Sequence, residues 1–175
     1  MRHQVGHPLT VAALDDFNDE PADRAVQRLR ACNAAPRFAA EVVAGRPYRD
    51  VATLVRRAED VARSLPWEDV AIALAAHPRI GDRVDGASAE AESSRREQSS
   101  MKDADAATRA ALLEGNRAYE ERFGHVFLIR ASGRAPEEML TELHRRLDDD
   151  EETERAEVTE QLAQITAIRV RGLVS

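Results

Sequence analysis

The residues best suited to chemistry in this chain lie in two short motifs, His-Pro-Arg-Ile-Gly at residues 77–81 and Ser-Arg-Arg-Glu-Gln at residues 94–98. Pro78 disfavours a helical conformation at His77, so the histidine is expected at the C-terminal end of a helix. The negative end of the helix dipole favours the imidazolium form, and a nearby carboxylate would favour it further. We therefore expect His77 to be a proton donor near neutral pH.

The second motif places three polar side chains on one face of an expected helix. Ser94, Glu97 and Gln98 are spaced i, i+3 and i+4, and residues at this spacing are neighbours on a helix surface. Together they offer a hydroxyl, a carboxylate and an amide, which suit a small ligand rich in amide and urea groups. With His77, they predict an acid/base site for a polar anion that does not depend on a metal.

Each motif also has an ordinary structural interpretation. A histidine before proline often does no more than end a helix, and a run such as Ser-Arg-Arg-Glu-Gln is often a solvated helix surface. The remaining histidines offer no competing metal site: His125 and His144 are isolated, and no His-Glu-x-x-His pattern occurs. His3 and His7 have helical spacing, but the glycine and proline beside them disfavour a helix there.

Composition limits the class of protein. A chain of 175 residues with 43% hydrophobic residues predicts one domain over residues 1–175, with residues 1–9 as a flexible arm. The net charge of −7 argues against a nucleic-acid partner, and no apolar stretch approaches the ~20 residues of a membrane span. Cys32 is the only cysteine, which excludes an internal disulfide and fits a cytoplasmic protein.

The hydrophobic pattern is helical throughout and predicts an all-α fold, with no stretch that alternates convincingly with period two. A loop is expected over residues 79–87, and a short extended link over residues 126–131. The acidic run at residues 148–152 is interpreted as a solvated helix start, because carboxylates favour the positive end of the dipole. Helices are expected over residues 10–17, 21–32, 37–44, 50–65, 66–76, 88–102, 105–123 and 136–147, with a last helix ending near residue 173.

Four sequence blocks together resemble the 2-oxo-4-hydroxy-4-carboxy-5-ureidoimidazoline (OHCU) decarboxylase family. They are the two motifs above, Asn-x-x-Tyr-x-x-x-Phe-Gly at residues 116–124 with the apolar segment 127–131 behind it, and Ile-Thr-Ala-Ile-Arg-Val at residues 165–170. Weaker similarity at Phe-Asn 17–18, Cys32 and Arg-Pro-Tyr 46–48 extends the resemblance over nearly the whole chain. The chain departs from the family pattern at Asn33, Phe38 and Arg130.

The resemblance implies an all-α, usually dimeric lyase that converts OHCU to (S)-allantoin and carbon dioxide without a cofactor. The departing carboxylate of OHCU lies next to a ring C=N, which can accept the electron pair, so neither a metal nor an organic cofactor is needed as an electron sink. It also implies a functional partnership with urate oxidase and 5-hydroxyisourate hydrolase.

Site roles follow from the same resemblance. His77 is expected to be the catalytic acid, Glu97 to hold the imidazole or the substrate ring, and Arg169 to meet the carboxylate or the developing enolate. Arg169 is preferred to Arg171, which points in another direction on an ideal helix. Ser94 and Gln98 are expected to bond the ring and ureido groups of the substrate, and Pro78 to shape the pocket beside the histidine. Backbone groups of the segment behind them are expected to line the far wall of the substrate pocket, at Phe127, Leu128, Ile129, Arg130 and Ala131.

Two alternatives remain open at this point. The chain could be an enzyme of the same fold that acts on a related ureido or hydantoin acid, with Arg130 altering specificity, or a binding module that has lost the reaction. Individual assignments also have simpler interpretations: Glu97 could lie on a helix surface, and Arg169 could pair with a nearby acid.

Overall fold

The computed structural model describes residues 8–82 and 84–175, with side chains from residue 12 onward. This part of the chain is helical and contains no strand, as the sequence predicts. The expected arm at residues 1–9 falls largely outside the described residues, although Pro8 and Leu9 belong to the first helix. The helices are α1 Pro8–Asp19, α2 Ala22–Arg30, α3 Pro36–Ala44, α4 Val51–Arg63, α5 Trp67–Ala75, α6 Ala89–Glu97, α7 Ala106–Phe123, α8 Pro136–Arg146 and α9 Glu151–Leu173, with a 3₁₀ helix, η1, at Ser99–Asp103.

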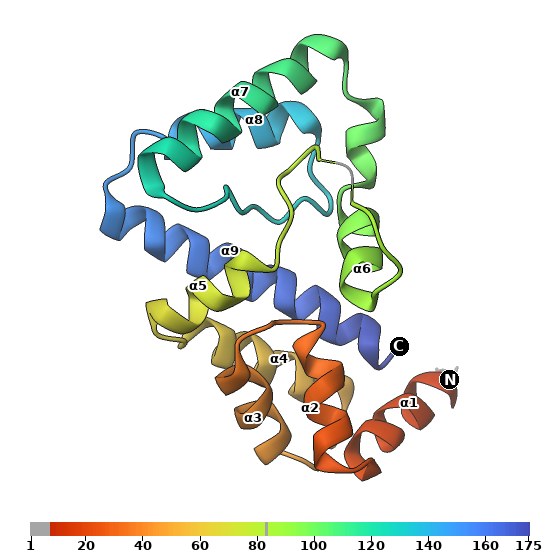
Figure 1. Cartoon of the computed structure of the whole chain (residues 1–175). Helices are drawn as coiled ribbons and strands as arrows, with labels where there is room; N and C mark the ends of the chain where they lie inside the picture. Colours follow the sequence, from red (N-terminus) through yellow and green to blue (C-terminus); the bar gives the residue numbers. More distant parts are fainter. Residues whose placement is uncertain (1–7, 83) are drawn as a thin grey trace, which may run out of the picture.

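The long helix α9 runs through the middle of the molecule (Figure 1). On one side it packs along α4, which is in turn packed with the α2 and α3 pair, and on the other side lie α7 and α8. Two hydrophobic clusters correspond to these sides, one centred on α2 to α5 and α9, the other on α7, α8 and segment 127–131. Helix α6 crosses near the C-terminal half of α9 (Figure 1).

Three of the helices begin with the same kind of N-cap hydrogen bond. The helices α4, α7 and α9 each begin after an aspartate whose side chain accepts a hydrogen bond from the backbone N–H of a threonine three residues later. Such caps satisfy N–H groups that the first helical turn leaves unpaired. These bonds join Asp50 to Thr53 at 2.7 Å, Asp105 to Thr108 at 2.7 Å and Asp150 to Thr153 at 2.8 Å. The acidic run at residues 148–152 leads into α9 and, apart from the half-buried Asp149, is exposed.

His77 directly follows Ala76, the C-cap residue of helix α5. The His77 N–H donates to the Leu74 carbonyl at 3.0 Å, and Pro78 then stops the helical ladder. Gly81 has φ of +89°, a left-handed conformation that glycine adopts without strain. The described parts of the expected loop, residues 79–82 and 84–87, contain no helix or strand and precede α6.

Helix α6 is shorter than the sequence predicts. It ends at Glu97, and Gln98, with φ of −91° and ψ of 15°, separates it from η1. The prediction of one helix over residues 88–102 was therefore wrong at its C-terminal end. Ser99 and Ser100 follow directly, and serine hydroxyls compete with the backbone for hydrogen bonds, which weakens helix continuation.

Candidate active site

His77 lies in the wall of a cavity and is only 9% exposed. The cavity has a volume of about 330 Å³, and its lining includes Pro78, Glu90 and Ser94; we call it the His77 cavity. Two of the residues that the sequence places in the site, Pro78 and Ser94, therefore share one cavity with the histidine. The loop before α6 and the first turns of α6 supply the other lining residues.

The resting protonation of His77 is set by its burial rather than by the helix dipole. Burial lowers the pKa of the imidazole to about 3, and the positive charge of Arg169 lowers it further. Removing the ring from water disfavours its charged form, and this effect outweighs the helix dipole on which the prediction rested. At neutral pH, His77 is a neutral imidazole that can both accept and donate a proton.

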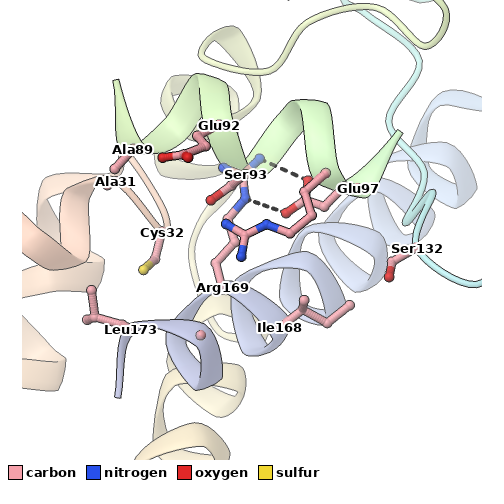
Figure 2. Close-up of a pocket in the computed structure, with 12 residues that line it drawn as sticks. Ala31, Cys32, Ala89, Glu92, Ser93, Glu97, Ser132, Ile168, Arg169 and Leu173 are labelled. Carbon is pink, nitrogen blue, oxygen red and sulfur yellow. Dashed lines mark hydrogen bonds and ion pairs between the residues drawn. The ribbon is translucent and has the colours of Figure 1, made fainter. Parts of the chain in front are cut away.

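Arg169 joins α9 to α6 through a set of directed hydrogen bonds (Figure 2). Its Nε donates to Glu97 Oε1 at 2.8 Å, and its Nη2 donates to Glu97 Oε2 at 3.1 Å and to Ser94 Oγ at 3.2 Å. The Arg169 side chain is only 3% exposed and that of Glu97 15%. Arg171, by contrast, is exposed.

The structure does not bring Glu97 to the histidine. The Glu97 carboxylate is engaged by the Arg169 guanidinium, as the simpler interpretation of Arg169 anticipated, and no hydrogen bond joins it to His77 among the described residues. Glu97 and Arg169 line a second cavity of about 260 Å³, together with Cys32, Ser132 and Ile168 (Figure 2). Ser94 lies between the two, lining the His77 cavity while accepting a bond from Arg169.

Gln98 and Asn116 hold the two polar groups of one peptide unit. Asn116 Nδ2 donates to the Ile80 carbonyl at 3.0 Å, and the Gly81 N–H donates to Gln98 Oε1 at 3.0 Å. The Ile80–Gly81 peptide is therefore clamped between α7 and the end of α6. Gln98, which the resemblance places at the substrate, uses its amide oxygen to fix the loop that follows His77.

Segment 127–131 contributes mainly to packing. The side chains of Phe127, Leu128, Ile129 and Ala131 are buried, and none of these residues lines the His77 cavity or the cavity beside Arg169. Arg130 is half-buried and also lies outside both linings, while its backbone N–H donates to Gln161 Oε1 at 2.9 Å. Ser132, one residue further on, is the member of this region that reaches a cavity.

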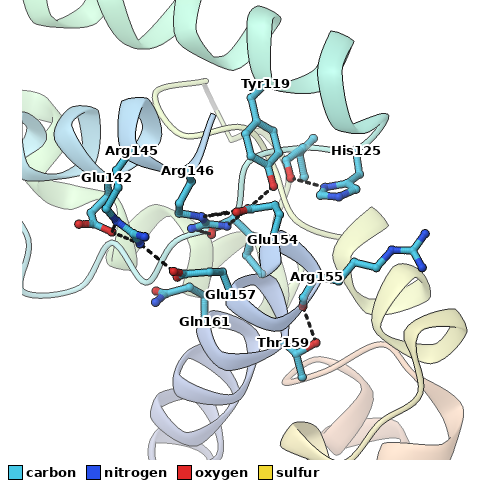
Figure 3. A network of polar contacts seen from close by, with 12 residues as sticks. Tyr119, His125, Glu142, Arg145, Arg146, Glu154, Arg155, Glu157, Thr159 and Gln161 are labelled. Atoms are coloured by element: carbon cyan, nitrogen blue, oxygen red, sulfur yellow. Dashed lines mark hydrogen bonds and ion pairs between the residues drawn. The ribbon is translucent and has the colours of Figure 1, made fainter. Parts of the chain in front are cut away.

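A buried ion pair that the sequence did not reveal holds this segment in place (Figure 3). Arg146 binds Glu154 through Nε at 2.9 and 3.2 Å, and Tyr119 donates its hydroxyl to the same carboxylate. Arg146 Nη1 also donates to the Leu128 carbonyl at 2.7 Å, and its guanidinium lies 4.6 Å from the centre of the Phe127 ring. Both charged side chains are 1% exposed. The helical spacing of apolar residues carries no signal for such a pair.

Glu90 is a further polar residue of the His77 cavity that the sequence interpretation missed. It precedes Ser94 by one helical turn on α6 and is half-buried. Its spacing of four residues from Ser94 was a usable signal, because positions i and i+4 share a helix face.

These features define a class of protein: an all-helical enzyme whose site combines a neutral, buried histidine with a hydroxyl backed by a buried guanidinium–carboxylate pair. Groups of this kind suit proton transfer on a small anionic substrate. Among the described residues, no group of three or more His, Cys, Asp or Glu side chains is arranged to hold a metal ion. No helix in the described part of the chain is long and apolar enough to cross a membrane.

Comparison with known proteins assigns the family. The sequence profile of OHCU decarboxylase matches residues 18–171, and the chain belongs to the OHCU decarboxylase family, as the sequence blocks indicated. A crystal structure of OHCU decarboxylase in the presence of (S)-allantoin is similar over 83% of this chain and 95% of that chain, with a TM-score of 0.71 and 26% identity.

Two further relatives agree in fold or sequence. A crystal structure of (S)-allantoin synthase matches 91% of this chain and 53% of that chain, with a TM-score of 0.66; at 16% identity it supports the fold alone. The uric acid degradation bifunctional protein TTL of Arabidopsis thaliana is 35% identical over 107 residues, which are 59% of this chain. The chain spans about a third of the length of that bifunctional protein.

Proposed function

We propose that the protein decarboxylates OHCU to (S)-allantoin and carbon dioxide without a cofactor. The observation that carries the proposal is the His77 cavity, which a neutral imidazole and a serine both line, in a chain that matches the OHCU decarboxylase profile from residue 18 to residue 171. We place the substrate in this cavity.

The Ser94 hydroxyl is oriented by its neighbour. Because Ser94 Oγ already accepts a hydrogen bond from Arg169, its own proton is free to donate into the His77 cavity. A substrate carboxylate there would accept that proton in a hydrogen bond and would also feel the positive charge of Arg169. Glu97 holds the guanidinium in one orientation through two bonds and so serves as a positioning residue.

The reaction consumes one proton, which comes from solvent, because an anionic substrate gives neutral allantoin and carbon dioxide. The bond between ring carbon C4 and the carboxylate breaks, its electron pair forms a C4=C5 double bond, and the ring C=N electron pair moves to nitrogen, which takes the solvent proton. The neutral His77 then removes the proton of the 4-hydroxyl and delivers a proton to C5, which leaves a C4 carbonyl. Delivery from the histidine side of the cavity sets the S configuration.

The neutral resting state fits this sequence of steps. An imidazole with a low pKa first accepts the hydroxyl proton and then becomes the acid that the resemblance implies. The negative charge of the bound substrate favours the transient imidazolium. The ring C=N of the substrate is the electron sink, so no metal or organic cofactor takes part in any step.

The setting of the enzyme is also part of the proposal. We expect a cytoplasmic homodimer that receives its substrate from the combined action of urate oxidase and 5-hydroxyisourate hydrolase. Sedimentation equilibrium of the purified protein measures the dimer directly, and a mass of 19.4 kDa at all concentrations would contradict it.

The reaction is tested by adding the protein, dialysed against a chelator, to OHCU generated freshly from urate. Carbon dioxide release and a growing circular dichroism signal of (S)-allantoin, both faster than in buffer, are expected. Release of carbon dioxide at the buffer rate would contradict the proposal. Turnover of another ureido or hydantoin acid with a higher kcat/KM would favour the related enzyme instead.

A further inference from the structure

The proposed substrate has hydrogen-bonding groups of two kinds at its two ends. Its carboxylate and ring oxygen accept hydrogen bonds, whereas its ureido group carries N–H donors. In the His77 cavity, the Ser94 hydroxyl can donate a hydrogen bond to the acceptor end, and the positive charge of Arg169 lies behind Ser94. The donor end requires an acceptor on the cavity wall.

Glu90 is placed to be that acceptor. Glu90, Ser94 and Glu97 follow one another at i, i+4 and i+7 along α6, and Glu90 lines the His77 cavity together with Ser94 and His77. Its side chain is half-buried. Within the described residues, no hydrogen bond or ion pair engages its carboxylate, although Arg169 is near enough to influence it electrostatically.

The surroundings of Glu90 make an unpartnered carboxylate unfavourable. Burial raises the pKa of the Glu90 carboxyl, and the positive charge of Arg169 opposes this change. A half-buried acceptor with no donor loses part of its hydration without compensation. A ligand that supplies donors relieves this cost, so the site favours ligands with N–H groups at this position.

The ureido group has the matching geometry. Its two N–H bonds on the side away from the carbonyl lie nearly parallel, and an ionised carboxylate presents two oxygens that accept in the same plane. We propose that Glu90 determines specificity for the ureido group, by accepting N–H hydrogen bonds from a substrate bound in the His77 cavity. This inference rests on the proposed function for the identity of the substrate.

The experiment compares Glu90→Gln with wild type and with Glu138→Gln. Glu138 is an exposed glutamate in the first turn of α8, so its substitution removes the same charge away from both cavities. Steady-state kinetics with OHCU should give a KM raised about tenfold in Glu90→Gln, the ratio expected for weakening a hydrogen bond to a charged group. The kcat should change less than the KM, and Glu138→Gln should match wild type.

Binding of two stable compounds separates the ureido contact from the rest of the site. Allantoin carries the ureido group, and hydantoin is the same ring without it. Calorimetric affinity for allantoin should fall about tenfold in Glu90→Gln, whereas affinity for hydantoin should stay within twofold of wild type. An unchanged or lower KM in Glu90→Gln, or an equal loss of affinity for both compounds, would overturn the role of Glu90.

Failure of this inference is distinguishable from failure of the proposed function. If wild type does not accelerate OHCU decarboxylation, the proposed function fails, and the calorimetric comparison still tests Glu90 directly. If wild type turns over OHCU and the two compounds bind Glu90→Gln as they bind wild type, only the inference about Glu90 fails. Absence of measurable allantoin binding to wild type also counts against the role of Glu90.

Discussion

Arg169 and Glu97 lie 72 residues apart in the sequence and form a two-bond ion pair at 2.8 and 3.1 Å. The pair joins two helices, because Glu97 is the last residue of α6 and Arg169 lies near the end of α9. Since the Arg169 side chain is almost completely buried, the Glu97 carboxylate compensates a positive charge that water reaches poorly.

Replacing Glu97 with Gln should therefore affect both stability and turnover. Removal of one partner of a buried ion pair leaves an uncompensated charge, and we expect the free energy of unfolding to fall by about 3 kcal/mol. Turnover should fall by about 100-fold, because Ser94 and Arg169 lose their fixed orientation. Urea denaturation and steady-state kinetics measure the two effects.

Arg169→Gln and Arg171→Gln provide the matched comparison. Both substitutions remove one guanidinium from α9, but Arg171 is exposed. Activity should be lost in the first and retained in the second. Comparable activity in the two variants would show that the buried guanidinium is dispensable.

The low pKa of His77 predicts a stability that depends on pH. The pKa is about 3 in the folded protein and 6.5 in the unfolded chain, so between these values the unfolded state binds a proton that the folded state excludes. Stability should decrease as pH falls from 6.5 toward 3, by about 1.4 kcal/mol per pH unit from this group. Above pH 6.5, His77 contributes no pH dependence.

The measurement is the free energy of unfolding at pH 7 and pH 5.5, in wild type and in His77→Asn. The drop between the two pH values should be smaller in His77→Asn by about 1 kcal/mol. All other titrating groups are common to both proteins, so they cancel in the difference. Equal drops in the two proteins would mean that His77 titrates normally in the folded state.

The peptide clamp predicts that Asn116 acts on the reaction through the loop after His77. Asn116→Ala leaves the Ile80 carbonyl without its partner, which should reduce stability by about 1–2 kcal/mol. At a temperature where the variant is fully folded, kcat should fall about tenfold with KM nearly unchanged, because the histidine is less well held. Arg117→Ala, an exposed change next to it, is the control.

Gln98 distinguishes positioning from substrate contact. Gln98→Leu removes the acceptor for the Gly81 N–H, and a positioning role predicts the same pattern as Asn116→Ala, a loss in kcat. A selective rise in KM would instead support the substrate-binding role that the sequence suggested.

The Arg146–Glu154 pair should be costly to break singly. With both side chains 1% exposed, Arg146→Met or Glu154→Gln should each reduce the free energy of unfolding by about 3–5 kcal/mol. The double variant Arg146→Met with Glu154→Leu should be more stable than either single variant, because no buried charge is left alone. Thermal denaturation checks the order, and a double variant less stable than both singles would contradict it.

The sequence predicted the helices well wherever a local signal marks an end. Asp50, Asp105 and Asp150 cap helices in the structure, and Pro78 and Gly81 mark the break after α5. The predicted helix that begins at residue 88 extends too far, to residue 102. The true end of α6 is followed by two serines, which mark a helix end less clearly than proline or glycine. The family and the all-α fold also followed from motif order, since four blocks in sequence are rarely accidental.

The electrostatic features could not be predicted from the sequence because they depend on packing between distant segments. The pKa of His77 is governed by burial and by Arg169, 92 positions away in the chain. The clamp on the Ile80–Gly81 peptide likewise requires Gln98, which follows α6, and Asn116, on α7, to meet at one peptide. Helical spacing gives the face of a side chain but not its partner.

In the proposed reaction, His77 transfers the proton that makes (S)-allantoin, and replacement of His77 tests this role most directly. The initial rate of the circular dichroism signal of (S)-allantoin is compared among wild type, His77→Asn and His144→Asn, each supplied with the same fresh OHCU. We expect a fall of at least about 100-fold in His77→Asn alone, the usual scale for loss of a general acid/base. An (S)-allantoin signal that grows in His77→Asn at the wild-type rate would contradict the account.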